Sequence, residues 1–94
     1  MKINFEWDGE KAKKNLKKHG VGFDEATTVF LDPFSITMTD PDHSEVEQRL
    51  IDIGDSDKNR VLVVVYTERK SQIRIISCRK ATPSERRFYE ERSI

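Results

Sequence analysis

The segment from Val61 to Tyr66 constrains the fold of this chain more than any other part of the sequence. It is the longest apolar run among the 94 residues, and it is far shorter than the roughly 20 apolar residues that a membrane-spanning helix needs. Together with Thr67 it consists almost entirely of β-branched and aromatic residues, as expected of a central strand covered on both faces. The chain is therefore expected to build a sheet around this strand, with no membrane as a partner.

Periodic patterns on either side of this run predict the remaining elements. Alternating apolar and polar residues predict strands, and apolar residues at helical spacing predict helices. The other expected strands cover residues 1–7, 34–39, 50–53 and 72–79. The expected helices cover residues 9–19, between an N-cap at Asp8 and a stop at Gly20, then residues 23–30, and finally a segment that begins at Pro83.

The start of the last helix carries the clearest local signal. Thr82 is a good N-cap, Pro83 suits the first helical position, and Glu85 stands where it can complete a capping box. Short, hairpin-like segments join most strands, so we expect a mostly antiparallel sheet of four to five strands. Two N-terminal helices and one C-terminal helix should pack on it, which gives an α+β fold in a single domain of residues 1–94.

Charge is distributed unevenly along the chain, although 17 basic and 17 acidic side chains cancel. Residues 60–94 hold seven arginines and two lysines against four acidic residues, whereas residues 23–59 hold ten acidic residues against one arginine and one lysine. A basic end beside an acidic middle is typical of a site for a polyanion on a surface that otherwise opposes indiscriminate binding. A chance distribution of solvated charge is the alternative at this point.

Few residues are available for metal, cofactor or thiol chemistry. The chain has two histidines far apart, His19 and His43, one cysteine, and no glycine-rich loop placed to hold a nucleotide. Cys78 falls within a predicted strand, so it is expected to be a small core residue, and it has no partner for an internal disulfide. No metal and no cofactor are expected, and because no apolar leader opens the sequence the expected location is cytoplasmic.

Cations gather around the predicted last strand and last helix. Arg79 and Lys80 stand where these two elements meet, and the first turn of the helix at Thr82 offers free backbone N–H groups and a partial positive charge. Of the other cations, Arg60 precedes the predicted central strand, Arg69 lies at the far turn of that strand, and Arg74 lies in the last strand. This pattern predicts a phosphate-binding corner, unless Arg79 and Lys80 are ordinary exposed residues at a strand end.

RNA can be cleaved at such a corner without a metal, because its 2′-hydroxyl is an internal nucleophile and arginines stabilise the charged transition state. Glu85 would accept the proton of this hydroxyl or orient the arginines, unless it serves only the capping box. Tyr89, one helical turn later, would stack on a base or donate a proton, with packing on the sheet as the alternative. His19 is compatible with the same site, although a helix-capping histidine is commoner, and Trp7 is expected in the core.

Several blocks of the sequence match a known family in the same order. They are Phe5 to Asp8, the residues from Asn15 to Phe23, Arg60 to Arg69, and Ile73 to Thr82 followed by Glu85 and Arg86. On these blocks, which are distributed along nearly the entire chain, the sequence resembles the BrnT family, the toxins of bacterial type II toxin–antitoxin pairs. The resemblance implies a RelE-like fold, endoribonuclease activity that arrests growth, neutralisation by a BrnA-like ribbon-helix-helix antitoxin, and contact with operator DNA only through that antitoxin.

The resemblance also implies roles for individual residues. In RelE-like toxins an arginine at the start of a central strand, another at the end of the last strand, and a reactive side chain six residues later face the RNA. The matching positions, and so the expected catalytic residues, are Arg60, Arg79 and Glu85. Together with the cations and rings described above, the expected RNA-binding residues are Arg69, Arg74, Lys80, Arg86, Tyr89 and His19.

The chain departs from the family pattern at three points. Glu85 stands where some RelE-like enzymes have tyrosine, and the lysine pair of a RelE central strand has no clear match. Cys78 replaces the small residue expected before Arg79, which should alter only packing. We therefore expect a mechanism that differs in detail. The competing hypothesis is a non-catalytic module that binds RNA or an antitoxin and acts only in operon regulation.

Overall fold

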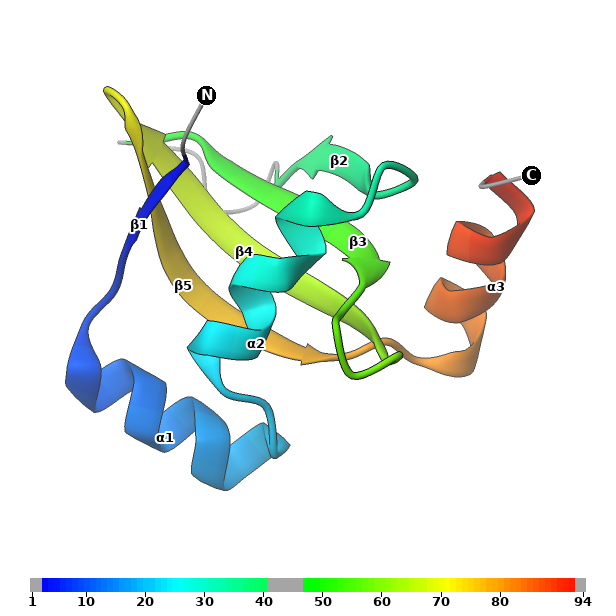
Figure 1. The fold of residues 1–94 in the computed structure, drawn as a ribbon, viewed down its shortest axis with the longest axis horizontal. Coiled ribbons are helices and arrows are strands. Elements are labelled where there is room, and N and C mark those ends of the chain that lie inside the picture. The colour runs from blue at the N-terminus through cyan, green and yellow to red at the C-terminus, as the bar shows by residue number, and fades with distance from the viewer. Residues whose placement is uncertain (1–2, 41–46, 93–94) are drawn as a thin grey trace.

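The helices and strands follow one another in the predicted order in the computed structural model, which describes residues 3–40 and 47–92 (Figure 1). The elements are β1 (Asn4–Glu6), α1 (Gly9–His19), α2 (Phe23–Thr28), the 3-10 helix η1 (Val29–Leu31), β2 (Ile36–Thr39), β3 (Arg49–Asp55), β4 (Val61–Arg69), β5 (Gln72–Lys80) and α3 (Pro83–Arg92). The fold is α+β, as expected. The predicted turn that contains His43 lies largely outside the described residues.

The apolar run forms the middle strand of the sheet. Five strands are arranged in the order β1-β5-β4-β3-β2, so two strands lie on each side of β4. The pairs from β2 to β5 are antiparallel, and β1 runs parallel to β5. Between Leu62 and Thr67 every residue of β4 except Val65 is buried. The prediction of a central strand covered on both faces is therefore confirmed.

The two faces of the sheet are covered by different helices. Because side chains alternate along a strand, Leu62 lies in one core cluster with Phe23 of α2, whereas the next residue, Val63, lies in another with Tyr89 of α3. In Figure 1, α2 lies in front of the sheet, α1 lies at the lower left, and α3 stands at the right-hand end. The first cluster comprises Val21, Phe23, Ala26, Val29, Leu62, Val64, Tyr66, Ile75 and Cys78.

A buried asparagine fixes α1 against the end of β5. The helix begins at the predicted N-cap Asp8 and ends at Gly20, which has the left-handed φ of 71° that favours glycine. In its last turns, Asn15 donates hydrogen bonds to the carbonyls of Val21 (3.0 Å) and Cys78 (2.8 Å), and its Oδ1 accepts one from the Cys78 N–H (3.1 Å). Cys78 is 1% exposed, as predicted for a core residue.

Trp7 does not lie in the core, so this prediction was wrong. It is 38% exposed, and its ring meets Phe23 edge-on at a centroid distance of 6.0 Å. The predicted first strand extended to Trp7, but β1 ends at Glu6 and pairs over only three residues. Outside a paired strand, alternation no longer dictates which face a side chain takes.

Candidate active site

The start of β4, the end of β5 and the start of α3 meet at one end of the sheet. Leu62 of β4 pairs with Lys80 of β5, and one step further the Ala81 N–H donates a hydrogen bond of 2.9 Å to the Val61 carbonyl. α3 then begins at Pro83, as predicted. Arg60 directly precedes β4, so antiparallel pairing alone brings it near the β5–α3 junction.

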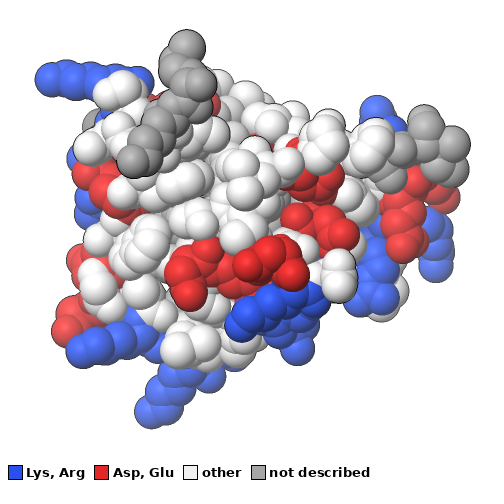
Figure 2. Space-filling view, in the orientation of Figure 1, with Lys and Arg blue, Asp and Glu red and all other residues white. Residues whose placement is uncertain are grey.

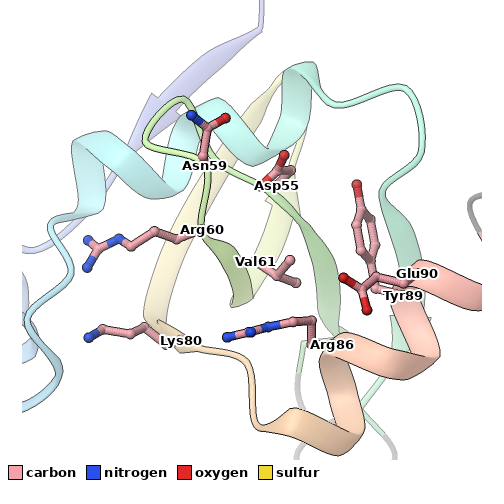
Figure 3. Close-up of a pocket in the computed structure, with 8 residues that line it drawn as sticks. All are labelled: Asp55, Asn59, Arg60, Val61, Lys80, Arg86, Tyr89 and Glu90. Atoms are coloured by element: carbon pink, nitrogen blue, oxygen red, sulfur yellow. The ribbon is translucent and has the colours of Figure 1, made fainter.

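A pocket of about 410 Å³ opens at this end of the sheet (Figure 3). It is lined by Asp55, Asn59, Arg60, Val61, Lys80, Arg86, Tyr89 and Glu90. Arg60, Lys80 and Arg86 come from three separate segments and extend toward the same side of the pocket in Figure 3. The structure thus brings together three of the predicted cations and Tyr89.

Arg60 is held by a carboxylate that the sequence reasoning missed. Its Nε donates to Oε2 of Glu25 (3.0 Å) and its Nη2 donates to Oε1, while Nη2 also reaches the Gly20 carbonyl (3.3 Å). Glu25 is only 4% exposed and accepts a further hydrogen bond from the Ser56 hydroxyl (2.7 Å). The hydrogen bonds from Arg60 lower the pKa of Glu25 despite its burial, so the carboxyl is ionised at neutral pH.

The helical pattern contained a signal for this pair. Glu25 precedes Val29 by four residues, so both share the buried side of the predicted second helix. A carboxylate on a buried side requires a cation or hydrogen-bond donors. That signal could have suggested that Glu25 pairs with a distant arginine, but it could not have identified that arginine as Arg60.

Arg79 forms the second arginine–carboxylate pair, with Glu85. Arg79 Nη1 and Nη2 donate to the two Glu85 oxygens at 2.7 and 2.9 Å. Glu85 also completes the predicted capping box, because its Oε1 accepts from the Thr82 N–H (2.8 Å) and its own N–H donates to Thr82 Oγ1 (3.2 Å). The Arg79 hydrogen bonds, with those from Thr82, lower the pKa of Glu85 to about 2. So low a pKa makes Glu85 a weak base at neutral pH, which favours its orienting role.

Arg60 and Arg79 lie on opposite faces of the sheet. Lys80 pairs with Leu62 on the face of α1 and α2, so its neighbour Arg79, which pairs with Val63, points to the other face. Neither Arg79 nor Glu85 is among the residues that line the pocket. The three expected catalytic residues, Arg60, Arg79 and Glu85, therefore do not line one shared pocket.

Arg69 lies at the far turn of β4, as predicted, and Arg74 lies near the same end of the sheet, away from Arg60. β4 has nine residues, so its two ends are about 30 Å apart. Arg69 pairs with Glu47, with Nε 2.7 Å from Oε2, and Arg74 lies 3.5 Å from an oxygen of Glu6. These two predicted RNA-binding residues therefore lie at the opposite end of the hairpin from Arg60.

Tyr89 lines the pocket but is largely buried, and His19 lies beside Gly20, which accepts a hydrogen bond from Arg60. Tyr89 is 8% exposed, and its hydroxyl donates a hydrogen bond to Oδ2 of Asp32. Burial and this carboxylate raise the pKa of Tyr89, which favours the packing alternative for its ring. His19 is the last residue of α1, next to the Gly20 carbonyl that accepts from Arg60, and it is partly buried.

Within residues 3–40 and 47–92, no three histidine, cysteine or acidic side chains gather as a set of metal ligands. In the same part of the chain, no helix has the length and apolar character to span a bilayer.

Replacement of Glu85 by glutamine is expected to lower the free energy of unfolding by about 1 kcal/mol at neutral pH, because the pair with Arg79 is partly exposed and screened. The usual pKa of 4.5 falls to about 2 in the folded protein. The contribution is therefore complete above about pH 4.5 and is lost as the pH falls toward 2. Urea denaturation of both proteins across this range measures it, and a difference that persists at the acid end would contradict the ionic explanation.

Comparisons with known proteins agree with the fold. A family model described as a ribonuclease toxin, BrnT, of type II toxin–antitoxin systems matches residues 7–85. The structure is similar to the crystal structure of the Brucella abortus ribonuclease toxin BrnT, with a TM-score of 0.65 and 25% identity over 86% of this chain and 99% of that one. No curated protein matches the sequence. The range matched by the family model includes Arg60, Arg79, Lys80 and Glu85 and ends before Arg86.

Proposed function

The chain belongs to the BrnT family of ribonuclease toxins of type II toxin–antitoxin systems, and from this premise we propose that it is a metal-independent endoribonuclease whose cutting of RNA arrests growth. Membership implies an RNA substrate and an antitoxin partner. The observation that carries the proposal is the pocket where Arg60, Lys80 and Arg86 converge. Three cations from separate segments in one pocket suit a phosphate of RNA.

In this proposal the RNA strand crosses the end of the sheet, with Arg60 on one side of it and Arg79 on the other. Arg60, Lys80 and Arg86 bind phosphate on the pocket side, and Arg79 approaches from the other face. The side chain of Arg79 is 40% exposed, so one edge of its guanidinium remains accessible beside Glu85. Arg79 stabilises the transition state, and Glu85 orients it rather than acting as the base.

The reaction itself needs no metal. The 2′-oxygen forms a bond to phosphorus while the bond from phosphorus to the 5′-oxygen breaks, which leaves a 2′,3′-cyclic phosphate and a 5′-hydroxyl. The 2′-hydroxyl loses one proton and the 5′-oxygen gains one, so the step is balanced. Negative charge accumulates on the oxygens of the crowded phosphorus, where arginines are most effective.

A non-catalytic role in operon regulation is the second candidate. It is favoured by one observation, that Arg60 and Arg79 are each bound to a carboxylate. Incubation of the purified protein with RNA and a chelator separates the two candidates. Cutting that resists the chelator supports the nuclease, whereas binding with no cutting, with or without added divalent metal, would leave only the regulatory role.

We place the protein in the cytoplasm, where its RNA substrate is made, with a BrnA-like ribbon-helix-helix antitoxin that connects it to operator DNA. The surface around η1 suits a partner segment that is both apolar and basic. Leu31 is 78% exposed and Phe34 is 57% exposed, which is uncommon for such large apolar side chains. Beside Leu31, a cavity of about 260 Å³ is lined by Asp32, Asp55 and Asp57 among others. We propose that the antitoxin covers this surface.

Replacement of both Leu31 and Phe34 by serine is expected to weaken neutralisation at least tenfold while RNA cleavage stays unchanged, because the two side chains would supply apolar contact area to the partner but lie outside the pocket. The product of the adjacent gene, titrated into a cleavage assay, measures this. Equal neutralisation of the variant and the unaltered protein would exclude this surface.

A further inference from the structure

The helix α1 carries a concentration of positive charge that neither the fold nor the pocket uses. Its five lysines are all exposed, and Glu10 is its single acidic residue. Lys13 lies 4.0 Å from Glu10. The other four lysines of the helix make no ion pair with any residue in the described part of the chain; they are Lys11, Lys14, Lys17 and Lys18. Unpaired cations in a row on one helix form a surface for an anionic ligand.

This surface is continuous with the pocket. α1 ends at His19, and the carbonyl of the next residue, Gly20, accepts a hydrogen bond from Arg60 Nη2 (3.3 Å). Asn15 also ties the same end of the helix to Cys78, two residues before Lys80. The last turn of α1, with Lys17 and Lys18, is therefore held rigidly beside the cations of the pocket.

The distribution of charge over the molecule supports one continuous path. Figure 2 shows basic side chains along the lower border of this face and a band of acidic side chains above them. In the same orientation, α1 occupies the lower left and α3 the right-hand end (Figure 1). A polyanion that enters the pocket would be attracted toward α1 and repelled from the acidic band.

We propose that Lys14, Lys17 and Lys18 bind phosphates of the nucleotides that flank the scissile one, so that α1 extends the RNA site beyond the pocket. This inference rests on the proposed function. Contacts of this kind depend on charge and not on base identity, so α1 would lengthen the bound segment without selecting its sequence. An acidic protein partner is less favoured, because lysine is depleted at protein interfaces and Leu16 is the one large apolar side chain that the helix exposes.

The test measures binding to RNA that cannot be cut through its 2′-hydroxyl. A tetranucleotide and a dodecanucleotide, both fully 2′-O-methylated, are titrated at several salt concentrations against three proteins. These are the unaltered chain, Lys17→Gln with Lys18→Gln, and a control with the same loss of charge, Lys13→Gln with Lys70→Gln. Lys13 is paired with Glu10, and Lys70 lies at the far end of the sheet, beyond β4.

For the dodecanucleotide, we expect the Lys17 and Lys18 replacements to reduce the slope of log affinity against log salt by about 1.4, since each lost contact with a single strand contributes about 0.7. The slope for the tetranucleotide, and both slopes of the control, should change by less than roughly 0.3, which is about half of what one contact contributes. An unchanged dodecanucleotide slope, an equal change for both oligonucleotides, or an equal change in the control would overturn the inference. Tighter binding of polyglutamate than of the dodecanucleotide would also overturn it, in favour of an acidic protein.

The outcome can be separated from that of the proposed function. Binding of methylated RNA does not require cleavage, so the α1 surface can be demonstrated even if unmodified RNA is never cut. Conversely, cutting of unmodified RNA together with an unchanged slope would reject the α1 surface alone. Circular dichroism of the Lys17 and Lys18 variant confirms that the helix is retained.

Discussion

Replacement of Arg79 by alanine is expected to reduce the rate of RNA cleavage by a factor of about 100 to 1,000, the usual cost of removing one donor from a charged transition state. Arg79 has the exposure needed to reach a phosphate, and Glu85 fixes the plane of its guanidinium through two hydrogen bonds. The measurement is single-turnover cleavage of a labelled RNA in the presence of a chelator. The effect should appear in the rate at saturating enzyme rather than in RNA affinity.

Two control variants show whether the loss of rate is specific to the paired donors of Arg79. Arg79→Lys keeps the charge but loses the paired donors, so it should recover only part of the rate. Lys70→Ala removes an exposed cation at the opposite end of the sheet and should leave the rate unchanged. If Arg79→Ala cleaves as fast as the unaltered protein while Lys70→Ala behaves as expected, Arg79 has no catalytic role.

Replacement of Arg60 by alanine is expected to have the largest effect on stability, a loss of about 3 kcal/mol in the free energy of unfolding at neutral pH. The side chain of Glu25 is only 3% exposed, and without Arg60 its carboxylate would retain the Ser56 hydroxyl but no paired cation. The penalty arises from this uncompensated charge, and the pKa of Glu25 should therefore rise in the variant. Urea denaturation at neutral pH measures the loss.

At acid pH, the free energy of unfolding of Arg60→Ala should come closer to that of the unaltered protein. The pKa of Glu25 is lowered in the folded protein, so its contribution is present above its usual pKa of 4.5 and is lost as the pH falls below it. Adding Glu25→Gln to Arg60→Ala should also restore part of the stability. The matched control is Arg69→Ala, whose pair with Glu47 is exposed and screened by solvent and should therefore contribute far less to stability. Equal losses for Arg60→Ala and Arg69→Ala would contradict the buried-pair explanation.

The parts of this protein that follow from local sequence are those whose signals lie within a few residues. The β-branched run could be recognised as the central strand because burial on both faces leaves no polar alternation, and Thr82 with Glu85 marks a helix start within one turn. The Asn15 contacts join residues 63 positions apart, and Arg60 and Glu25 are 35 apart. Side-chain periodicity carries no information on such pairings.

Four of the residues that line the pocket, Arg60, Lys80, Arg86 and Tyr89, were among the predicted residues, but their arrangement was not predicted. Neighbours in a strand point to opposite faces, so Arg79 and Lys80 could not both face one pocket, and this could have been inferred from the predicted strand itself. The distance of Arg69 and Arg74 from Arg60 follows from the hairpin between β4 and β5. Tyr89 was placed correctly on the helix face of Glu85, but its hydroxyl partner, Asp32, comes from a loop that no local pattern connects to α3.

The most direct test of the account is the chemistry of the ends that cleavage leaves. An unmodified RNA and its 2′-O-methylated counterpart are incubated with the protein in excess chelator, and the products are identified by mass spectrometry. If the 2′-hydroxyl attacks a phosphate held by arginines, the unmodified RNA gives 2′,3′-cyclic phosphate and 5′-hydroxyl ends, and the methylated RNA is bound but intact. Cleavage of the methylated RNA, or products that end in a 5′-phosphate and form only when divalent metal is added, would contradict it.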